Sequence, residues 1–173
     1  MNEYEKARNE YRPKKTKIIF IPESPPDTKK GKKARYFYFE HGASSLFRSI
    51  MEVLFPEDYK NFVARKISKK DLLLKFQHHG YFLIDACGYP INQLPKEKDK
   101  NAEIKRNANK LIKELTKNAK LVLIKKNVYQ MLFRELRGKG FNAINNNFLP
   151  FPSYGHQKKF RYGLRELLKS IRT

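Results

Sequence analysis

The chain has 173 residues, and its 38 Lys and Arg against 17 Asp and Glu give a formal net charge of +21. Hydrophobic residues make up 40% of the sequence, including 13 Phe and 10 Tyr, which is enough to build a core and excludes a wholly disordered basic chain. The single cysteine, Cys87, excludes a disulfide framework and any site that needs several thiolates, such as a zinc ribbon or a Cys-ligated iron–sulfur cluster.

The length and the apolar pattern predict one domain spanning residues 1–173. No apolar run approaches the roughly 18 residues that a membrane-spanning helix needs, and the N-terminal segment MNEYEKARNEYRPKK lacks the apolar stretch of a signal peptide. We therefore expect a cytoplasmic protein that makes no contact with a membrane. Its charge favours a nucleic acid as partner, although a lysine-rich proteome would raise the charge without any DNA contact.

Short apolar strands alternate with amphipathic helices along the chain. The segment 17–21 (KIIFI) predicts a buried strand that ends at Pro22. Apolar residues then recur at helical spacing up to residue 54, with Ser44 or Ser45 as the N-cap and Pro56 just past the end.

A capping-box pattern, Ser68 with Asp71, starts the next predicted helix, which Gly80 ends. The same periodicities predict strands at 81–86, 121–124 and 141–144, and helices with apolar stripes at 104–115, 128–136 and 160–171. Segments 22–35 and 91–101 are predicted surface loops. Because strands separated by helices imply right-handed crossovers, we expect a three-layer α/β/α fold around a mainly parallel four-stranded sheet.

Loops containing proline follow three of the predicted strands and carry groups capable of acid–base chemistry. Glu23 follows the first strand, Asp85 lies near the end of the second, and His156 closes the segment after the last one. Ligands of open parallel sheets bind outside the carboxyl ends of the strands, so these three side chains are candidates for one site. The structural alternatives are that Glu23 caps a turn and that Asp85 is a buried partner of an arginine.

The other histidines give no pattern for a metal site. His78 and His79 occupy adjacent positions of a predicted helix, which do not face one site. We expect neither a metal nor a cofactor.

Three segments together resemble the uracil-DNA glycosylase superfamily. They are 21–26 (IPESPP), 82–86 (FLIDA) and 149–156 (LPFPSYGH), and their order covers essentially the whole chain. They are similar to the loop that faces the scissile bond, the strand that contacts the base, and the loop that clamps the DNA backbone. Within the superfamily, the ESPP and FPS motifs resemble a glycosylase-like branch. The resemblance implies a monomeric enzyme that removes a deaminated base such as uracil from DNA.

The resemblance, together with the residue types, gives each candidate a role. The catalytic candidates are Glu23, Asp85 and His156. The candidates for holding the base are Tyr36, Phe37, Tyr38 and Phe151. The candidates for contacting the DNA backbone are Ser24, Ser153, Lys29, Lys30, Lys158, Lys159 and Arg161.

The sequence departs from the superfamily's pattern at two of these positions. Phe151 stands where the motif often has a histidine, so His156 would have to substitute for it. Asp85 stands where many members carry an asparagine that reads the base, and an ionised carboxylate can only accept hydrogen bonds.

Each group of candidates also has a structural reading. The aromatic run 36–39 can pack in the core, the serines can cap turns, and the lysines can form a solvated face. For the whole protein, the alternatives are a non-catalytic nucleic-acid-binding protein on the same fold, a nucleotide or nucleoside hydrolase, and an unrelated α/β hydrolase.

Overall fold

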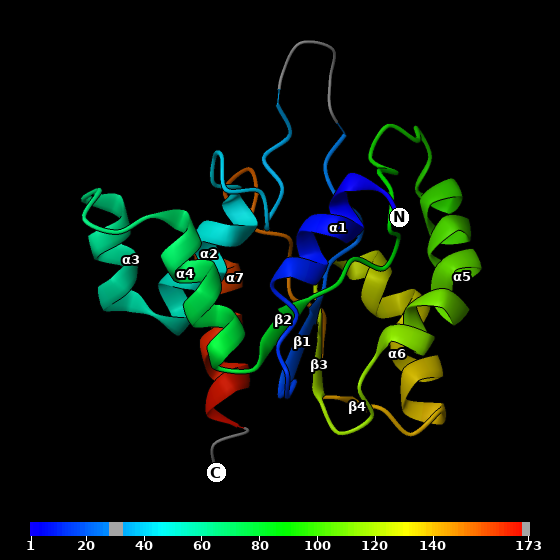
Figure 1. The fold of residues 1–173 in the computed structure, drawn as a ribbon. Coiled ribbons are helices and arrows are strands. Elements are labelled where there is room, and N and C mark those ends of the chain that lie inside the picture. The colour runs from blue at the N-terminus through cyan, green and yellow to red at the C-terminus, as the bar shows by residue number, and fades with distance from the viewer. Residues whose placement is uncertain (28–32, 171–173) are drawn as a thin grey trace.

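A parallel sheet lies at the centre of the computed structural model, which describes residues 1–27 and 33–170 (Figure 1). Within these ranges the sheet has four strands in the order β2-β1-β3-β4, and every neighbouring pair is parallel. The strands are β1 (Ile18–Ile21), β2 (Tyr81–Leu83), β3 (Lys120–Leu123) and β4 (Asn142–Ala143). Their carboxyl ends point toward the top of Figure 1, where the chain leaves β1.

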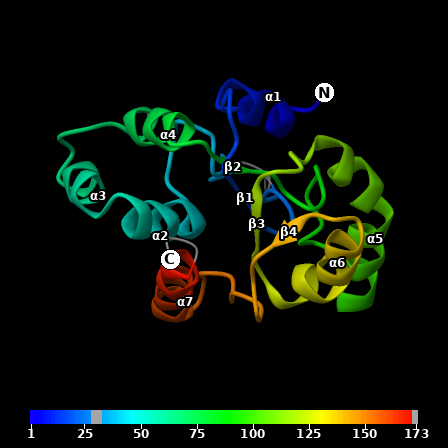
Figure 2. The same ribbon diagram turned by 90° about the horizontal axis from the view of Figure 1, so that it is seen from below.

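Helices cover both faces of the sheet, which confirms the predicted three-layer α/β/α architecture (Figure 2). On one side α5 (Glu97–Glu114) packs against α6 (Lys126–Gly138). On the other side α2 (Ser45–Leu54) packs against α7 (Gln157–Lys169), with α3 (Pro56–Val63) and α4 (Lys69–His78) beside them. The short helix α1 (Glu3–Glu10) lies next to β2 at the edge of the sheet. None of the described helices combines the length and the apolar character needed to cross a bilayer.

The caps of α2 and α4 are those that the sequence predicts. The Ser44 side chain accepts a hydrogen bond from the amide of Phe47 at 3.1 Å. Ser68 and Asp71 form a full capping box, in which each side chain accepts from the other residue's backbone amide. Such caps satisfy amide groups that a helix leaves without partners in its first turn.

Two helices differ from the sequence-based expectation. Pro56, predicted to follow a helix end, also occupies the first position of α3, where its missing N–H costs no hydrogen bond. The mostly polar helix α1 packs on the core through Tyr4, and two ion pairs join it to α5: Arg8 lies 2.6 Å from Glu114, and Glu5 lies 2.6 Å from Lys110. Tertiary contacts, rather than periodicity, therefore fix its position.

The predicted loop and strand boundaries also need correction. Segment 91–101 is only in part a loop, because α5 begins at Glu97. The second strand stops at Leu83 rather than at residue 86, although the amide of Ala86 still donates to the carbonyl of Pro22 at 2.8 Å. The first loop is not entirely a surface loop either, since Glu23 and Pro25 are buried.

Gly80 and Gly140 provide a matched test of how closely the turn between α4 and β2 approaches the backbone at Lys15. Both have positive φ, +80° and +79°, but a Cβ at Gly80 would lie 2.7 Å from the Lys15 carbonyl oxygen, whereas one at Gly140 would meet nothing within 4 Å. Both alanine variants carry the backbone strain, about 1–2 kcal/mol, and only Gly80→Ala adds a backbone clash. In urea denaturation we expect Gly80→Ala to lose clearly more stability than Gly140→Ala. Equal losses would contradict the close approach.

Candidate functional site

Backbone hydrogen bonds continue past the ends of the strands and align the loops that follow them. The register pairs Ile21 of β1 with Leu123 of β3, so Glu23 and Lys125, each two residues further on, follow neighbouring strands. The amide of Cys87 donates to the Glu23 carbonyl at 2.9 Å, and the amide of Lys125 donates to the Leu149 carbonyl at 2.7 Å. The four chain segments therefore meet at one end of the sheet.

A cavity of about 540 Å³ opens where these segments meet. Its lining residues come from both sides of the sheet's carboxyl end: Glu23, Ser24, Pro25, Pro26, Arg35, Tyr36, Phe37, Ser44, Ser45, Leu46, Leu83, Asp85, Asn92, Lys125, Phe151, Ser153 and Tyr154. The volume lies in the range of small-molecule sites, and eight of these seventeen side chains are apolar or aromatic, whereas nine are polar or charged.

Glu23 is buried in the wall of this cavity, with only 6% of its surface exposed. Its Oε2 lies 2.6 Å from the Nζ of Lys125, and its Oε1 accepts a hydrogen bond from the side-chain amide of Asn127. The other end of the Asn127 side chain accepts from the amide of Val128 at 2.9 Å. Both carboxylate oxygens are thus held by donors that are themselves fixed at the start of α6.

Asp85 lies in a different environment from Glu23. Its Oδ2 accepts a hydrogen bond from the Tyr36 hydroxyl at 2.9 Å. Burial raises the pKa of Asp85 to about 7, although the Tyr36 hydrogen bond and the charge of Arg8 act in the opposite direction. A carboxyl group with this pKa is partly protonated at neutral pH, and in that form it can donate a hydrogen bond as well as accept one.

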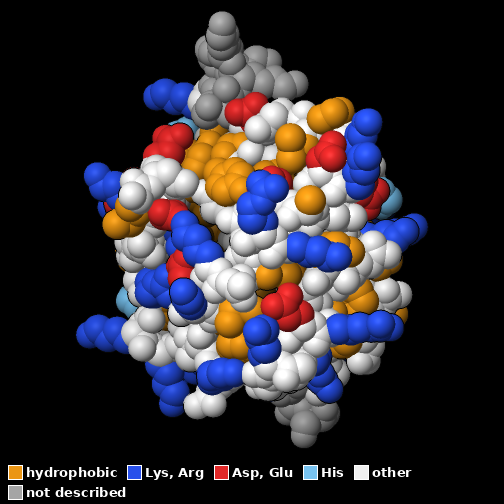
Figure 3. Space-filling model, turned by 90° about the vertical axis from the view of Figure 1, so that its right-hand side faces the viewer, with side chains coloured by type: hydrophobic (Ala, Val, Ile, Leu, Met, Phe, Trp, Pro, Cys, Tyr) orange, Lys and Arg blue, Asp and Glu red, His pale blue; other side chains and the backbone are white. Residues whose placement is uncertain are grey.

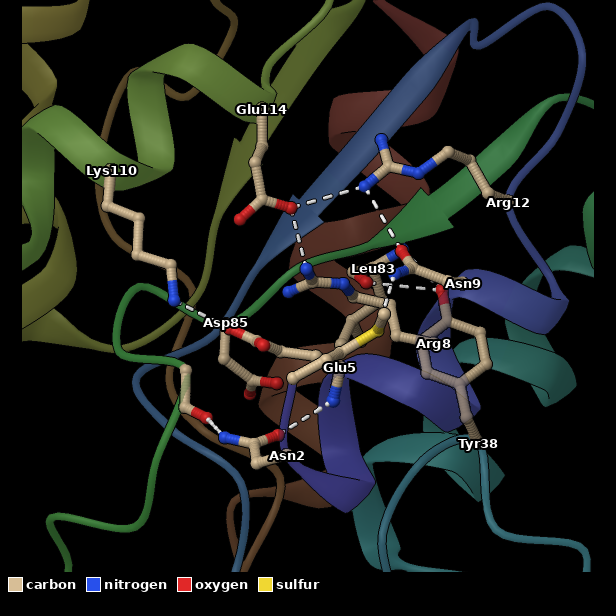
Figure 4. A network of polar contacts seen from close by, with 12 residues as sticks. Asn2, Glu5, Arg8, Asn9, Arg12, Tyr38, Leu83, Asp85, Lys110 and Glu114 are labelled. Carbon is tan, nitrogen blue, oxygen red and sulfur yellow. Dashed lines mark hydrogen bonds and ion pairs between the residues drawn. The ribbon is translucent and has the colours of Figure 1, made fainter.

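A polar network that links α1 to α5 lies beside Asp85 (Figure 4). Arg8 reaches from α1 to Glu114 of α5 at 2.6 Å, and Arg12 reaches the same carboxylate at 3.2 Å. One structural alternative made Asp85 the buried partner of an arginine. Arg8 pairs with Glu114 instead, although its charge still acts to lower the pKa of Asp85.

Five further residues predicted from the sequence line the same cavity: Tyr36, Phe37, Phe151, Ser24 and Ser153. Tyr36 and Phe37 are each 2% exposed, so each side chain packs in the core and also lines the cavity. The Ser24 hydroxyl accepts a long hydrogen bond of 3.4 Å from the amide of Ile91, which indicates that it also stabilises the loop. Their roles toward a ligand stay predictions.

Among the catalytic and base-binding candidates, two are not brought into the cavity. Tyr38 is buried, and its hydroxyl bonds both the amide and the carbonyl of Leu83, at 2.7 and 3.2 Å. These groups belong to an edge strand, where they would otherwise lack partners, so Tyr38 completes the sheet. His156 is exposed at the N-cap of α7 and does not line the cavity. The chain turns away before it, because Tyr154 and Gly155 both have positive φ.

The predicted backbone-binding cations have different surroundings. Lys158 and Lys159 are exposed in the first turn of α7. Arg161 is partly buried and lies 3.3 Å from Glu52 of α2, so its charge is partly offset within the protein. Lys29 and Lys30 lie outside the described residues. On the face that includes α5 and α6, basic side chains are spread over the surface with acidic ones among them (Figure 3).

Sequence reasoning missed Lys125 and Asn127, the two partners of the Glu23 carboxylate. Both directly follow β3, and the rule that singled out Glu23 and Asp85 applies equally to that strand end. The position of Lys125 and Asn127 after a predicted strand was therefore sufficient to mark them as candidates from the sequence. Arg35 and Asn92, which also line the cavity, follow no strand directly and had no such signal.

We compared the chain with known proteins, and no family model, curated protein or solved structure matched it. Across residues 1–27 and 33–170, no three His, Cys, Asp or Glu side chains form a group that could hold a metal ion. The chemistry of the site therefore has to be inferred from the lining residues themselves.

The raised pKa of Asp85 predicts how stability changes with pH. Between about pH 4 and pH 7 the folded protein keeps a proton on Asp85 that the unfolded chain has lost, so stability falls as the pH rises through this window. Asp85→Asn cannot ionise and still offers Tyr36 an acceptor. In thermal or urea unfolding at pH 8 we expect it to exceed the wild type by on the order of 1–4 kcal/mol, with the gain vanishing near pH 4.

Asp99→Asn, which makes the same substitution near the surface on α5, is the matched control for the change of side chain. A stability difference for Asp85→Asn that is the same at pH 4 and at pH 8 would contradict a buried carboxyl with a raised pKa.

Proposed function

We propose that this protein hydrolyses the N-glycosidic bond of a deaminated base, such as uracil, in DNA. The observation that carries the proposal is that Glu23 and Asp85, two carboxyl groups in different environments, share one cavity with aromatic and proline side chains. The three segments that resemble the uracil-DNA glycosylase superfamily supply most of the residues lining it. In this proposal the target nucleotide leaves the stack and enters the cavity.

Glu23 is the group that we assign to the sugar. Cleavage of a glycosidic bond puts positive charge on the sugar ring, and a fixed carboxylate nearby stabilises that charge and orients the attacking water. Because Lys125 and Asn127 hold both oxygens of Glu23, the carboxylate is preorganised and needs little rearrangement during the reaction.

Asp85 is the group that we assign to the base. A neutral carboxyl group presents one donor and one acceptor, as does the asparagine that many members of the similar superfamily carry at this position. Its pKa of about 7 makes that form available at neutral pH. The aromatic lining adds stacking, which contributes about 1–3 kcal/mol per base, and Phe37 and Phe151 are the ring systems that we assign to it.

The rim of the cavity has groups suited to a DNA strand. Tyr154 lines the opening and is 98% exposed, so its ring is free to stack on a base beside the extruded one. Ser24 and Ser153 offer hydroxyl groups for phosphates, and Lys158 and Lys159 follow on α7. The net charge of +21 supports a polyanionic partner.

The test is an excision assay on end-labelled oligonucleotides that contain a single uracil, hypoxanthine or xanthine, followed by alkaline cleavage of abasic sites. We expect scission with at least one of these bases, and a loss of about 10²–10³-fold in the single-turnover rate for Glu23→Gln, because the variant removes the charge opposite the sugar. The matched control is Glu57→Gln, which changes an exposed carboxylate on α3 that pairs with its helix neighbour Lys60.

Thermal unfolding of both variants checks that any loss of rate is not a loss of folding. Absence of scission with every base, while the protein still binds DNA, would overturn the enzymatic proposal and favour a non-catalytic nucleic-acid-binding protein. Wild-type rates for a folded Glu23→Gln variant would show that the catalytic group lies elsewhere.

A further inference from the structure

Lys125 lies beside Glu23 in the wall of the cavity, and it is the more open member of the pair. Its side chain is 36% exposed against 8% for Glu23, and its Nζ lies 2.6 Å from the Glu23 Oε2. The Glu23 carboxylate accepts a hydrogen bond from one of the N–H groups of the Lys125 ammonium. The remaining N–H donors of a lysine ammonium can serve another acceptor, and the cavity is the space that this group lines.

The backbone of Lys125 is strained. Its φ of 86° and ψ of 145° fall in a region that is favourable for glycine and costs other residues on the order of 1–3 kcal/mol. Neighbouring chain segments hold it there: its amide donates to the Leu149 carbonyl at 2.7 Å, and its carbonyl accepts from the amide of Tyr129 at 3.1 Å. Glycine would remove the strain, so the presence of lysine indicates that its side chain has a use at this position.

The proposed reaction creates a positive charge on the sugar and a negative charge on the departing base. Glu23 is the partner of the first charge, and the second also needs one. The bond between C1′ and the base nitrogen breaks with both electrons going to the base, which leaves as an anion. The oxygen of one water bonds to C1′, and the proton that this water loses balances the one that the base anion takes up from solvent. Stabilising the anion calls for a cation or a strong donor beside the departing base.

Two described residues of the lining carry a positive charge, Lys125 and Arg35. Arg35 is exposed, whereas Lys125 is in contact with the carboxylate assigned to the sugar. C1′ and the base nitrogen are bonded atoms in the substrate, so the cation that serves the base must lie next to the anion that serves the sugar. The Glu23–Lys125 pair meets this requirement, because its two charges are opposite to those that the reaction creates.

We propose that Lys125 is a catalytic residue whose ammonium group stabilises the negative charge developing on the departing base. This inference rests on the proposed glycosylase function and adds the group that acts on the leaving base. Lys125 stays an ammonium throughout, and no proton has to leave it. The role differs from that of a purely structural partner of Glu23, because removing it should make the rate depend more strongly on how stable the free base anion is.

The test compares two substrates that differ in the leaving base. Uracil and 5-fluorouracil have nearly the same shape, but the fluorinated anion is more stable and needs less help to leave. For Lys125→Met, which keeps the chain length and removes the charge, we expect a single-turnover loss of about 10²–10³-fold on uracil and a loss at least about tenfold smaller on 5-fluorouracil, since one lost stabilising charge matters less there. Lys125→Arg should restore most of the uracil rate.

Two further variants test whether the loss of rate comes from a loss of folding or from the loss of any positive charge in the cavity. Lys125→Gly relieves the strained backbone but loses the ion pair with Glu23, as Lys125→Met does, so we expect it to unfold at a higher temperature than Lys125→Met while losing activity to the same extent. Arg35→Met removes the other cation of the lining, and any loss that it causes should be equal on the two bases.

Equal losses of Lys125→Met on uracil and 5-fluorouracil would overturn the inference, as would an undiminished rate on uracil, and both results leave the proposed function standing. If the wild type excises neither base, the proposed function fails, and this inference fails with it.

Discussion

The parallel pairing of β1 with β3 is the constraint on which the rest of the site depends. Its register sets Ile21 beside Leu123, and the two residues that follow each strand carry the chain to Glu23 and Lys125. Nothing in the loops alone would bring these side chains within 2.6 Å of each other across about a hundred residues of sequence. Since Leu149 continues the same hydrogen-bonding pattern, the third loop is fixed to the same end of the sheet.

The two carboxyl groups of the cavity obtain different chemical character from their surroundings. Glu23 lies between an ammonium group and a side-chain amide, whereas Asp85 is enclosed and has a tyrosine hydroxyl as its direct partner. Enzymes that need an ionised and a neutral carboxyl group at the same pH use this kind of contrast. The cost falls on stability, because the folded protein loses part of its advantage when Asp85 ionises.

Periodicity predicted the elements whose apolar faces pack on the sheet, and it failed where other forces decide. The helix α1 (Glu3–Glu10) is mostly polar, and it is held by the buried ring of Tyr4 and by ion pairs to α5, which are contacts that helical periodicity does not reveal. At the site, the strand-end rule found Glu23 and Asp85 but was not applied after β3, so Lys125 was missed. The role of His156 stays a prediction: the side chain does not line the cavity, and the positive φ of Tyr154 just before it occurs at a residue type that does not favour this conformation.

The most direct measurement is the affinity for oligonucleotides that carry a sugar analogue at the target position. A cationic aza-sugar resembles the charged sugar of the transition state, and a neutral tetrahydrofuran has nearly the same shape without the charge. If Glu23 faces the sugar, the wild type should bind the cationic analogue at least about 10²-fold more tightly, and Glu23→Gln should lose that preference. A basic protein would otherwise disfavour the added positive charge, so equal or weaker binding of the cationic analogue by the wild type would contradict the account.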